Sequence, residues 1–394
     1  MSPLNWFKKE KPMLSMQSMG GGAAGYMISG APPAIDASGG TKTTPGDGYV
    51  YHQFLGGGTF AVANAGKGSD GVIDVCIVGG GGGGSLDGGG GGGGGGFRIT
   101  TVDIADYGAG NYPVSVGAGG NGQPSTGPSP SRPPAGDGGS SSFNIPSSIT
   151  PSPISIICGG GGGGGPLNPS TTKVGRPGQP YPFPTASPPH PNATIYPGSG
   201  GGANKSGPYG GYGASSPNNS PKAFNSGSGR KGFGSYGGGG GGASGDGGIP
   251  VASTPAVDAR PGAQLPWALP TWGWGQYNSA GLSGQAPTSP DPTRPAGPGG
   301  ELPWGYGYFA GGGGGGGQSP GSLGGYGRSG GGNGSTLNNP YGGPPNSGGD
   351  GHGYWAAPGT GSGGGGSGPS GSVSPPIGGG QGAPGAVMIR YPVG

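Results

Sequence analysis

The sequence predicts a mainly β and irregular fold with almost no α-helix, in which a small antiparallel β-sandwich carries a bundle of polyglycine-II helices. Short segments rich in β-branched and aromatic residues, which are typical of strands, fill residues 49–158 and recur at residues 386–391. Several of them lead directly into uninterrupted runs of glycine. With 115 glycines and 48 prolines among 394 residues, and only 28% hydrophobic residues, the chain has too few apolar side chains for several ordinary cores.

The strand candidates are separated by glycine, asparagine, proline and aspartate, which favours an antiparallel sandwich. Phe97 and Ile99 alternate with Arg98 and Thr100, as in a strand with one buried face. In chain order the candidates are residues 49–54, 59–62, 71–78, 97–102, 112–116, 141–143, 154–158 and 386–391. Because a lone strand is not stable, we expect the last of them to return and pair with the N-terminal sheet.

Glycine runs follow the strands in a repeated pattern. The longest occupy residues 79–84, 88–96, 159–165, 237–242 and 311–317. A flexible linker is one interpretation of such tracts. The other, which we adopt, is the polyglycine-II helix, which has three residues per turn, rises about 3.1 Å per residue and leaves its peptide groups free to bond neighbouring helices. Since glycine has no Cβ, such helices can pack on all sides, so each run is expected to form one rod of a bundle.

These patterns divide the chain into four parts. Residues 1–45 are expected to be a docking arm that binds a partner through Trp6, Phe7, Lys8 and Lys9, and an arm folded back on its own domain is the alternative. The other parts are a β-sandwich with the first glycine runs at residues 46–158, the bundle with its loops at 159–385, and the returning strand at 386–394.

Aromatic residues concentrate in four proline-rich spacers, at residues 166–197, 249–276, 286–309 and 338–358. Proline stiffens these loops, and tyrosine and tryptophan in Gly/Ser/Asn-rich loops supply contact area at low entropic cost. We therefore expect a binding surface, and the alternative is that the rings cap the ends of the bundle. The candidate binding residues are Trp267, Trp272, Trp274, Tyr277, Trp304, Tyr306, Tyr308, Tyr354 and Trp355.

Charge and spacing argue against several functional classes. The 17 basic and 14 acidic residues form no cationic footprint for nucleic acid. No run of about 18 apolar residues predicts insertion into a membrane. No catalytic constellation, cofactor motif or metal-ligand spacing is present, and the candidate carboxylates among the spacer aromatics are Asp258, Asp291 and Glu301, which form no pair. We expect no enzyme, no cofactor and no metal site.

The two cysteines each lie at the end of an apolar strand. Cys76 and Cys158 both precede a glycine run. A pair of small buried side chains and a disulfide between equivalent strand ends are both compatible with these positions.

Five segments together resemble a known family. In order they are TFAVANAGKGSDGVIDVCIVGGGGGG, YPVSVGAGGNG, SSFNI, CGGGGGGG and GGGQGAPGAVMIRY, and they span roughly residues 55–391. This order resembles the glycine-rich domain of tail-fibre and adhesin proteins of tailed bacteriophages. The resemblance implies a layered polyglycine-II bundle whose variable loops contact a bacterial receptor. The arm, with KKEKPMLSMQSMGGGAAGYM, is more similar to the N-terminal tails of virion structural proteins of marine and cyanobacterial phages.

From this resemblance we expect a non-enzymatic virion protein assembled in the host cytoplasm. Its arm would attach to other virion proteins, and its aromatic loops would bind a host surface glycan or an outer-membrane protein, with a homotrimer or several copies on each particle. The alternative is a protein that decorates or stabilises the tail, baseplate or capsid without binding a receptor. An enzyme such as a glycan depolymerase is the third possibility, which the absence of a carboxylate pair disfavours.

Overall fold

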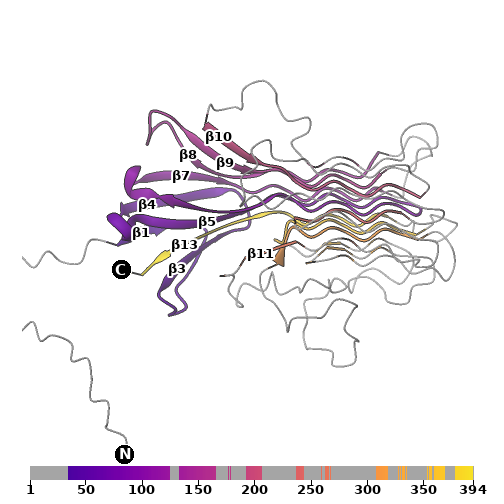
Figure 1. The fold of residues 1–394 in the computed structure, drawn as a ribbon, viewed down its shortest axis with the longest axis horizontal. Coiled ribbons are helices and arrows are strands. Elements are labelled where there is room, and N and C mark those ends of the chain that lie inside the picture. Colours follow the sequence, from indigo (N-terminus) through magenta and orange to yellow (C-terminus); the bar gives the residue numbers. More distant parts are fainter. Residues whose placement is uncertain are drawn as a thin grey trace, which may run out of the picture.

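The computed structural model shows a β-sandwich at one end of the molecule and a long bundle of extended rods at the other (Figure 1). It describes residues 34–124, 133–165, 176, 178, 192–205, 237–243, 259, 262–265, 267, 308–317, 327, 329, 331–332, 334, 353, 355–356, 359–368 and 378–393. Among these residues the helices are two 3-10 turns, η1 (Gly68–Gly71) and η2 (Ile104–Asp106), and neither is long enough to cross a membrane.

The first sheet of the sandwich has six strands in the order β1-β4-β7-β8-β9-β10. They are β1 (Ile35–Ser38), β4 (Gly58–Ala65), β7 (Gly110–Ser115), β8 (Ser141–Ile145), β9 (Ile154–Cys158) and β10 (Asn192–Tyr196). Every neighbouring pair is antiparallel except β9 and β10, which run parallel. The predicted antiparallel sandwich is therefore confirmed with one exception, and β10 lies inside the predicted spacer 166–197.

The second sheet has five strands in the order β2-β3-β13-β5-β6. They are β2 (Thr41–Thr43), β3 (Tyr49–Phe54), β13 (Ala386–Pro392), β5 (Val72–Val78) and β6 (Phe97–Asp103). The returning strand β13 lies at the centre, where Ile389 pairs with His52 on one side and Val75 on the other. The prediction that residues 386–391 return to the N-terminal sheet is confirmed.

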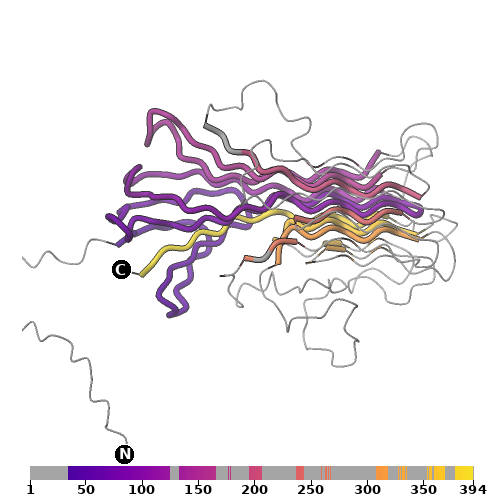
Figure 2. The backbone as a smooth tube through the Cα atoms, viewed as in Figure 1, coloured from indigo at the N-terminus to yellow at the C-terminus, as the bar shows by residue number. Residues whose placement is uncertain are grey.

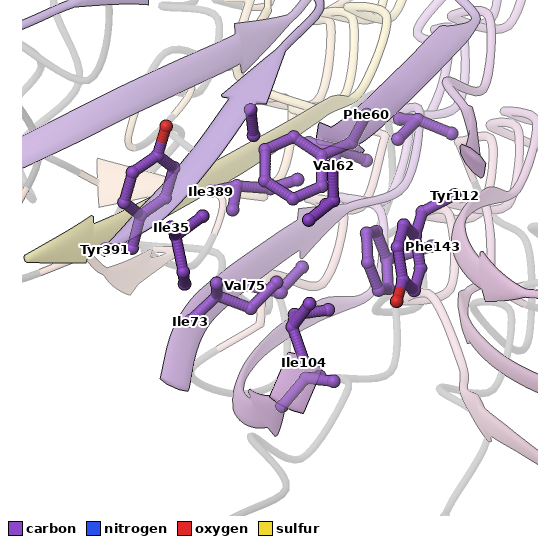
Figure 3. Packing of buried hydrophobic residues seen from close by; sticks show 14 of the residues in the cluster. Ile35, Phe60, Val62, Ile73, Val75, Ile104, Tyr112, Phe143, Ile389 and Tyr391 are labelled. Carbon is purple, nitrogen blue, oxygen red and sulfur yellow. The ribbon is translucent and has the colours of Figure 1, made fainter. Parts of the chain in front are cut away.

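The core of the sandwich lies between the two sheets (Figure 3). Its largest side chains are aromatic: Tyr112 stacks on Phe143 with ring centroids 5.9 Å apart, and Phe60 lies between Tyr112 and Tyr391. Aliphatic residues of the central strands, Ile73, Val75, Ile77, Val387 and Ile389, fill the rest. The alternating pattern of β-branched residues thus buries one face of each sheet against the other.

His52 is a buried polar group within this core. Its Nδ1 lies 2.7 Å from the Gly39 carbonyl oxygen and its Nε2 3.1 Å from the Tyr391 hydroxyl. A neutral ring protonated on Nδ1 donates to Gly39 and accepts from Tyr391, which satisfies both nitrogens. Burial lowers the pKa of His52 below its ordinary value of 6.5 and outweighs the carbonyl of Gly39, which raises it.

We expect this histidine to make the protein less stable in mild acid. Its pKa is lower in the folded state than in the unfolded state, so below about pH 6.5 the unfolded chain binds the extra proton and unfolding is favoured. The free energy of unfolding should be flat above that pH and fall with a slope of at most about 1.4 kcal/mol per pH unit below it. Denaturant unfolding between about pH 5 and 7.5 measures this, and His52→Gln should remove the slope. Equal slopes in the two proteins would contradict the assignment.

The strands continue without a turn into the rods of the bundle (Figure 2). Residues 79–85 leave β5 and residues 88–96 return to β6; residues 117–124 leave β7 and residues 133–140 return to β8. Residues 159–165 leave β9, residues 198–205 follow β10, and residues 378–385 lead into β13. The rods are named below by these residue numbers, together with 237–243, 311–317 and 361–368, and the described residues 353, 355 and 356 are called rod 353–356.

Hydrogen bonding confirms that the rods are polyglycine-II helices. Rod 79–85 donates to three different neighbours in turn, with N···O distances of 2.8–3.0 Å, and the direction of donation repeats at every third residue. The donors are Gly79, Gly82 and Ser85 to rod 88–96, Gly80 and Gly83 to rod 133–140, and Gly81 and Gly84 to rod 378–385. A repeat of three residues per turn, with all bonds between helices, is the polyglycine-II geometry predicted from the sequence.

Rod 79–85 lies at the centre of a ring of six rods. It also accepts bonds from Gly120, Gly161 and Gly364, which belong to rods 117–124, 159–165 and 361–368. Each member of the ring bonds the next, through Gly93 to Gly162, Gly138 to Gly161, Gly139 to Ala118, Gly382 to Gly120, Gly380 to Gly365, and Gly92 to Gly364. The peptide N–H groups of residues 79–85 and the carbonyl groups of residues 80–85 are therefore satisfied although the rod is buried.

The absence of a Cβ is what permits this packing. At Gly82 a Cβ would overlap the carbonyl oxygen of Gly162, and at Gly92 it would overlap that of Gly82. Rods with side chains at these positions could not come within hydrogen-bonding distance of all their neighbours. In the sandwich the two sheets are separated by their side chains. The rods that continue their strands have few side chains and therefore pack into one lattice.

A second apolar cluster covers the outer face of the five-stranded sheet. A two-stranded ribbon, β11 (Ala263–Gln264) and β12 (Tyr308–Phe309), lies against this face. Phe309 stacks on Phe97 of β6 with ring centroids 6.2 Å apart, and Leu265 and Trp267 belong to the same cluster. Part of the predicted spacer sequence is therefore structural.

Two details of the domain and cysteine predictions are corrected or resolved. The strands β1 and β2 pair with β4 and β3, so residues 35–43 belong to the sandwich and not to the predicted arm of residues 1–45. Cys76 and Cys158 are buried free thiols in different clusters, Cys158 between the sheets and Cys76 beneath the ribbon. Burial raises the pKa of both thiols, so neither is a reactive nucleophile.

Candidate functional site

The end of the bundle far from the sandwich, called the tip here, is the candidate functional site. It comprises residues 85–89, 123, 204–205, 237, 316 and 367–368. Lys205 N donates to Gly88 O, Gly237 N to Gly316 O, and Gly316 N to Gly89 O, with N···O distances of 2.8–2.9 Å. These bonds place the ends of several rods at one level, on a platform opposite the sandwich (Figure 1).

The turn between the first two rods organises the tip. Asp87 has φ of 56°, a left-handed conformation that aspartate tolerates better than most residues. Leu86 is fully buried, its peptide N–H donates to Gln123 Oε1 at 3.1 Å, and its carbonyl accepts from Asn204 Nδ2 at 2.9 Å. Ser85 Oγ also donates to Gln123 Oε1, at 2.7 Å. Buried amides thus hold together three rods that are distant in sequence.

An ion pair completes the turn. Lys205 Nζ lies 3.1 Å from Asp87 Oδ2, and the two side chains are 17% and 15% exposed. Because both are largely shielded from water, the pair adds local rigidity without leaving net charge on the turn. The tip is therefore a stiff and locally neutral platform.

Several chain segments outside the described residues begin and end at the tip. They are residues 125–132, 166–175, 206–236 and 369–377. The described residues on either side of each, such as Lys205 and Gly237, lie at this end of the bundle. By contrast, residues 268–307 are bounded by Trp267 and Tyr308, which lie beside the sandwich. These segments thus form a tip group and a base group, and of the four tip segments only residues 166–175 lie within a predicted spacer, 166–197.

The predicted binding residues do not form one site in the described part of the chain. Trp267 is 9% exposed, Tyr308 is half-buried in β12, and Trp355 is 58% exposed on the side of the bundle. The remaining candidates, Trp272, Trp274, Tyr277, Trp304, Tyr306 and Tyr354, lie outside the described residues, as do Asp258, Asp291 and Glu301.

Trp267 takes part in a cation–π cluster on the sandwich. The Arg390 guanidinium lies 4.8 Å from the Trp267 ring and 4.5 Å from the Tyr49 ring, and its Nε donates to Asp74 Oδ2 at 2.9 Å. Tyr51 packs beside Trp267 with centroids 6.2 Å apart, and burial together with the Asp47 carboxylate raises the pKa of Tyr51 to about 12. The indole of Trp267 therefore anchors the ribbon and has little surface left for a receptor.

Sequence reasoning missed the residues that build the tip. Ser85, Asp87, Gln123, Asn204 and Lys205 are polar residues within or next to glycine-rich rods. The sequence feature that could have identified them is that they interrupt or end a glycine-rich rod, where glycine is otherwise needed for packing. In the described residues no group of three or more His, Cys, Asp or Glu side chains could hold a metal ion.

A family model described as a glycine-rich domain matches residues 65–264, which is about half of the chain. The match begins at the end of β4 and extends to β11, so it covers strands and rods alike. No curated protein matches the chain. On the strength of the family match and of the interleaved strands and polyglycine rods, the chain belongs to the glycine-rich domain family.

Proposed function

We propose that the protein is a virion protein of a tailed bacteriophage, of the tail-fibre or tail-tip adhesin type, which presents loops at the tip of its bundle to a receptor on the host surface. The observation that carries the proposal is the construction of the bundle. Rods that run directly out of both sheets are bonded in a lattice, and chain segments repeatedly turn back at its far end. Such a body separates an attachment end from a contact end.

The physical argument rests on stiffness and on variable loops. A rod bonded to six neighbours cannot bend without breaking several interchain hydrogen bonds, so the tip keeps its distance and direction from the sandwich. Loops on a rigid scaffold tolerate sequence change and commonly carry binding function. The composition of one tip segment, residues 206–236, is glycine and serine with interspersed aromatic rings, which suits a glycan or the exposed loops of an outer-membrane protein.

The structure changes which loops we assign to the receptor. Residues 206–236 carry Tyr209, Tyr212, Phe224 and Phe233, and are bounded by tip residues on both sides. The tryptophan-rich residues 268–307 are bounded at the base instead. We therefore assign receptor contact first to the tip group, and attachment to other virion proteins to the sandwich end and the N-terminal arm with Trp6, Phe7, Lys8 and Lys9.

We expect replacement of residues 207–235 by a short Gly/Ser connector to abolish adsorption while the protein stays folded. Lys205 and Gly237 are both bonded within the tip, so a short connector can join them. The measurement is competition between the purified protein and phage for host cells, with thermal unfolding as the check on folding. The matched control replaces residues 270–305, at the base, by the same connector.

Comparison of the tip variant with the base variant shows which group of loops contacts the receptor. If the tip variant competes normally and the base variant does not, the assignment to the tip is wrong. If both variants compete normally and particles that lack the protein lose their integrity yet still adsorb, the protein decorates or stabilises the particle instead.

A further inference from the structure

One side of the bundle is open to solvent, with a regular pattern of exposure. In rod 117–124 every third residue is buried, at Gly117, Gly120 and Gln123, while Ala118, Asn121 and Pro124 are exposed. A three-residue period of burial means that a three-residue helix lies at the edge of the lattice, with one row of residues facing inward and one outward. This rod therefore forms part of an outer surface.

Two further rods extend this surface in a straight line. Rod 378–385 bonds rod 117–124 through Gly382 N to Gly120 O and Gly379 N to Gln123 O, at 2.9 and 3.0 Å. Rod 353–356 bonds rod 378–385 through Gly353 N to Gly378 O, and a Cβ on Gly353 would overlap Gly365 O of rod 361–368. In a lattice of six neighbours, a rod seated between these two lies in line with rod 117–124. We call these three rods, 117–124, 378–385 and 353–356, the three-rod face.

Three exposed side chains follow one another across this face. Asn121 lies between the two bonds that join its rod to the rod of Gln381, and Gln381 O accepts from Ala356 N, next to Trp355. Asn121, Gln381 and Trp355 are thus at about the same height along the bundle, one on each rod. All three are exposed, and Trp355 at 58% is more exposed than the other large exposed hydrophobic residues of the described chain, Leu55 and Val393.

The backbone of this face also offers hydrogen-bonding groups. The peptide N–H group of Gln381, an exposed residue of the middle rod, bonds no other described residue. Together with the side-chain amides of Asn121 and Gln381, each of which donates and accepts, it makes a row of polar groups beside the flat indole of Trp355. The described residues of the three rods carry no ionisable side chain.

We propose that the three-rod face binds a neutral polysaccharide, with the chain lying across the rods and a sugar ring stacked on Trp355. Sugar hydroxyls donate and accept hydrogen bonds, as do the amides of Asn121 and Gln381, and the apolar face of a pyranose matches the face of an indole. A protein partner would require a larger apolar patch, and an anionic polymer would require cations that the face lacks. The binding surface is flat and rigid because the rods supply it, so little order is lost on binding.

This inference does not rest on the proposed function, because it concerns the side of the bundle and holds whatever the tip binds. The test is affinity electrophoresis of the full-length protein through gels that contain dextran, galactomannan or hydroxyethyl cellulose, with anionic alginate for comparison. We expect retardation in at least one neutral gel, unchanged between about 0.05 and 0.5 M salt because no charge takes part. Trp355→Ala should weaken the apparent affinity by about tenfold or more, the effect of losing an aromatic anchor.

Further variants separate this surface from non-specific adhesion. Asn121→Ala and Gln381→Ala should each weaken binding by a smaller factor, whereas Leu55→Ala, which removes an exposed apolar side chain of the β3–β4 loop, should leave it unchanged. Since Trp355 is largely exposed, its replacement should not alter thermal unfolding. Absence of retardation in all neutral gels, equal retardation of the Trp355→Ala variant, or retardation only in alginate that salt abolishes would each overturn the proposal. Loss of binding here with intact host adsorption would leave the tip assignment standing.

Discussion

Gly92→Ala is expected to destabilise the protein by about 3 kcal/mol or more, and to disrupt the bundle in particular. Gly92 lies in the middle of rod 88–96, donates to Gly364 O at 2.8 Å and accepts from Gly313 N at 2.8 Å. A Cβ at this position would overlap the Gly82 carbonyl oxygen. Because the obstacle is backbone held in its own hydrogen bonds, no rotation of a side chain can relieve it, and the rods must separate. Each bond lost in that way leaves buried peptide groups unsatisfied.

The matched control is Gly56→Ala. Gly56 lies in the exposed β3–β4 loop, and a Cβ there would have no other atom within 4 Å. Both variants replace glycine by alanine, so both lower the conformational entropy of the unfolded chain in the same way. The difference between their free energies of unfolding therefore measures the packing of the rods. Denaturant and thermal unfolding, followed by circular dichroism, measure the two. Equal stability of the two variants would mean that the rods do not pack as closely as described.

Ile389→Asp is expected to prevent the sandwich from folding. Ile389 is fully buried at the centre of β13, between β3 and β5 and against the core of the two sheets. An aspartate there buries a carboxylate without a cation in that core, which costs several kcal/mol and rivals the whole stability of a typical domain. Because β13 holds the end of rod 378–385 in place, we expect the bundle to lose its order as well.

Val393→Asp provides the comparison for this second variant. Val393 follows β13 directly and is 49% exposed, so the same new charge meets water there. The measurements are the soluble yield and the near-ultraviolet circular dichroism of the two proteins. Both should be lost in Ile389→Asp and kept in Val393→Asp. A folded Ile389→Asp protein with a normal spectrum would show that β13 is dispensable, contrary to its central place in the sheet.

The sequence contained enough information for the main strands and for the conformation of the rods. β3, β5, β6 and β9 are dense in β-branched and aromatic residues, so propensity and burial agree, and the glycine runs leave few alternatives to a three-residue helix. The central position of β13 was not predictable beyond its pairing with the N-terminal sheet. Which strands it joins depends on contacts between residues more than 300 positions apart, as in the pair of Arg390 with Asp74.

The features that the sequence did not predict share one physical cause: each depends on contacts with residues that are distant in the sequence. β10 (Asn192–Tyr196) lies in a proline-rich spacer and is a strand because β9 offers it an edge, and β11 has only two residues. The packing of Arg390 and Tyr51 against the ring of Trp267 was not predicted either. The tip was not predicted at all, because Gln123, Asn204 and Leu86 meet only when three rods have been stacked.

The two halves of the molecule should respond differently to temperature, since they are held by different forces. The sandwich buries apolar side chains, and its unfolding raises the heat capacity, so its stability declines on cooling as well as on heating. The rods bury mainly peptide groups, as rod 79–85 does, and exposure of polar surface lowers the heat capacity. The free energy of unfolding of the bundle should therefore vary less with temperature than that of the sandwich. The bundle should stay rigid in the cold, where a support stabilised by a hydrophobic core would lose stability.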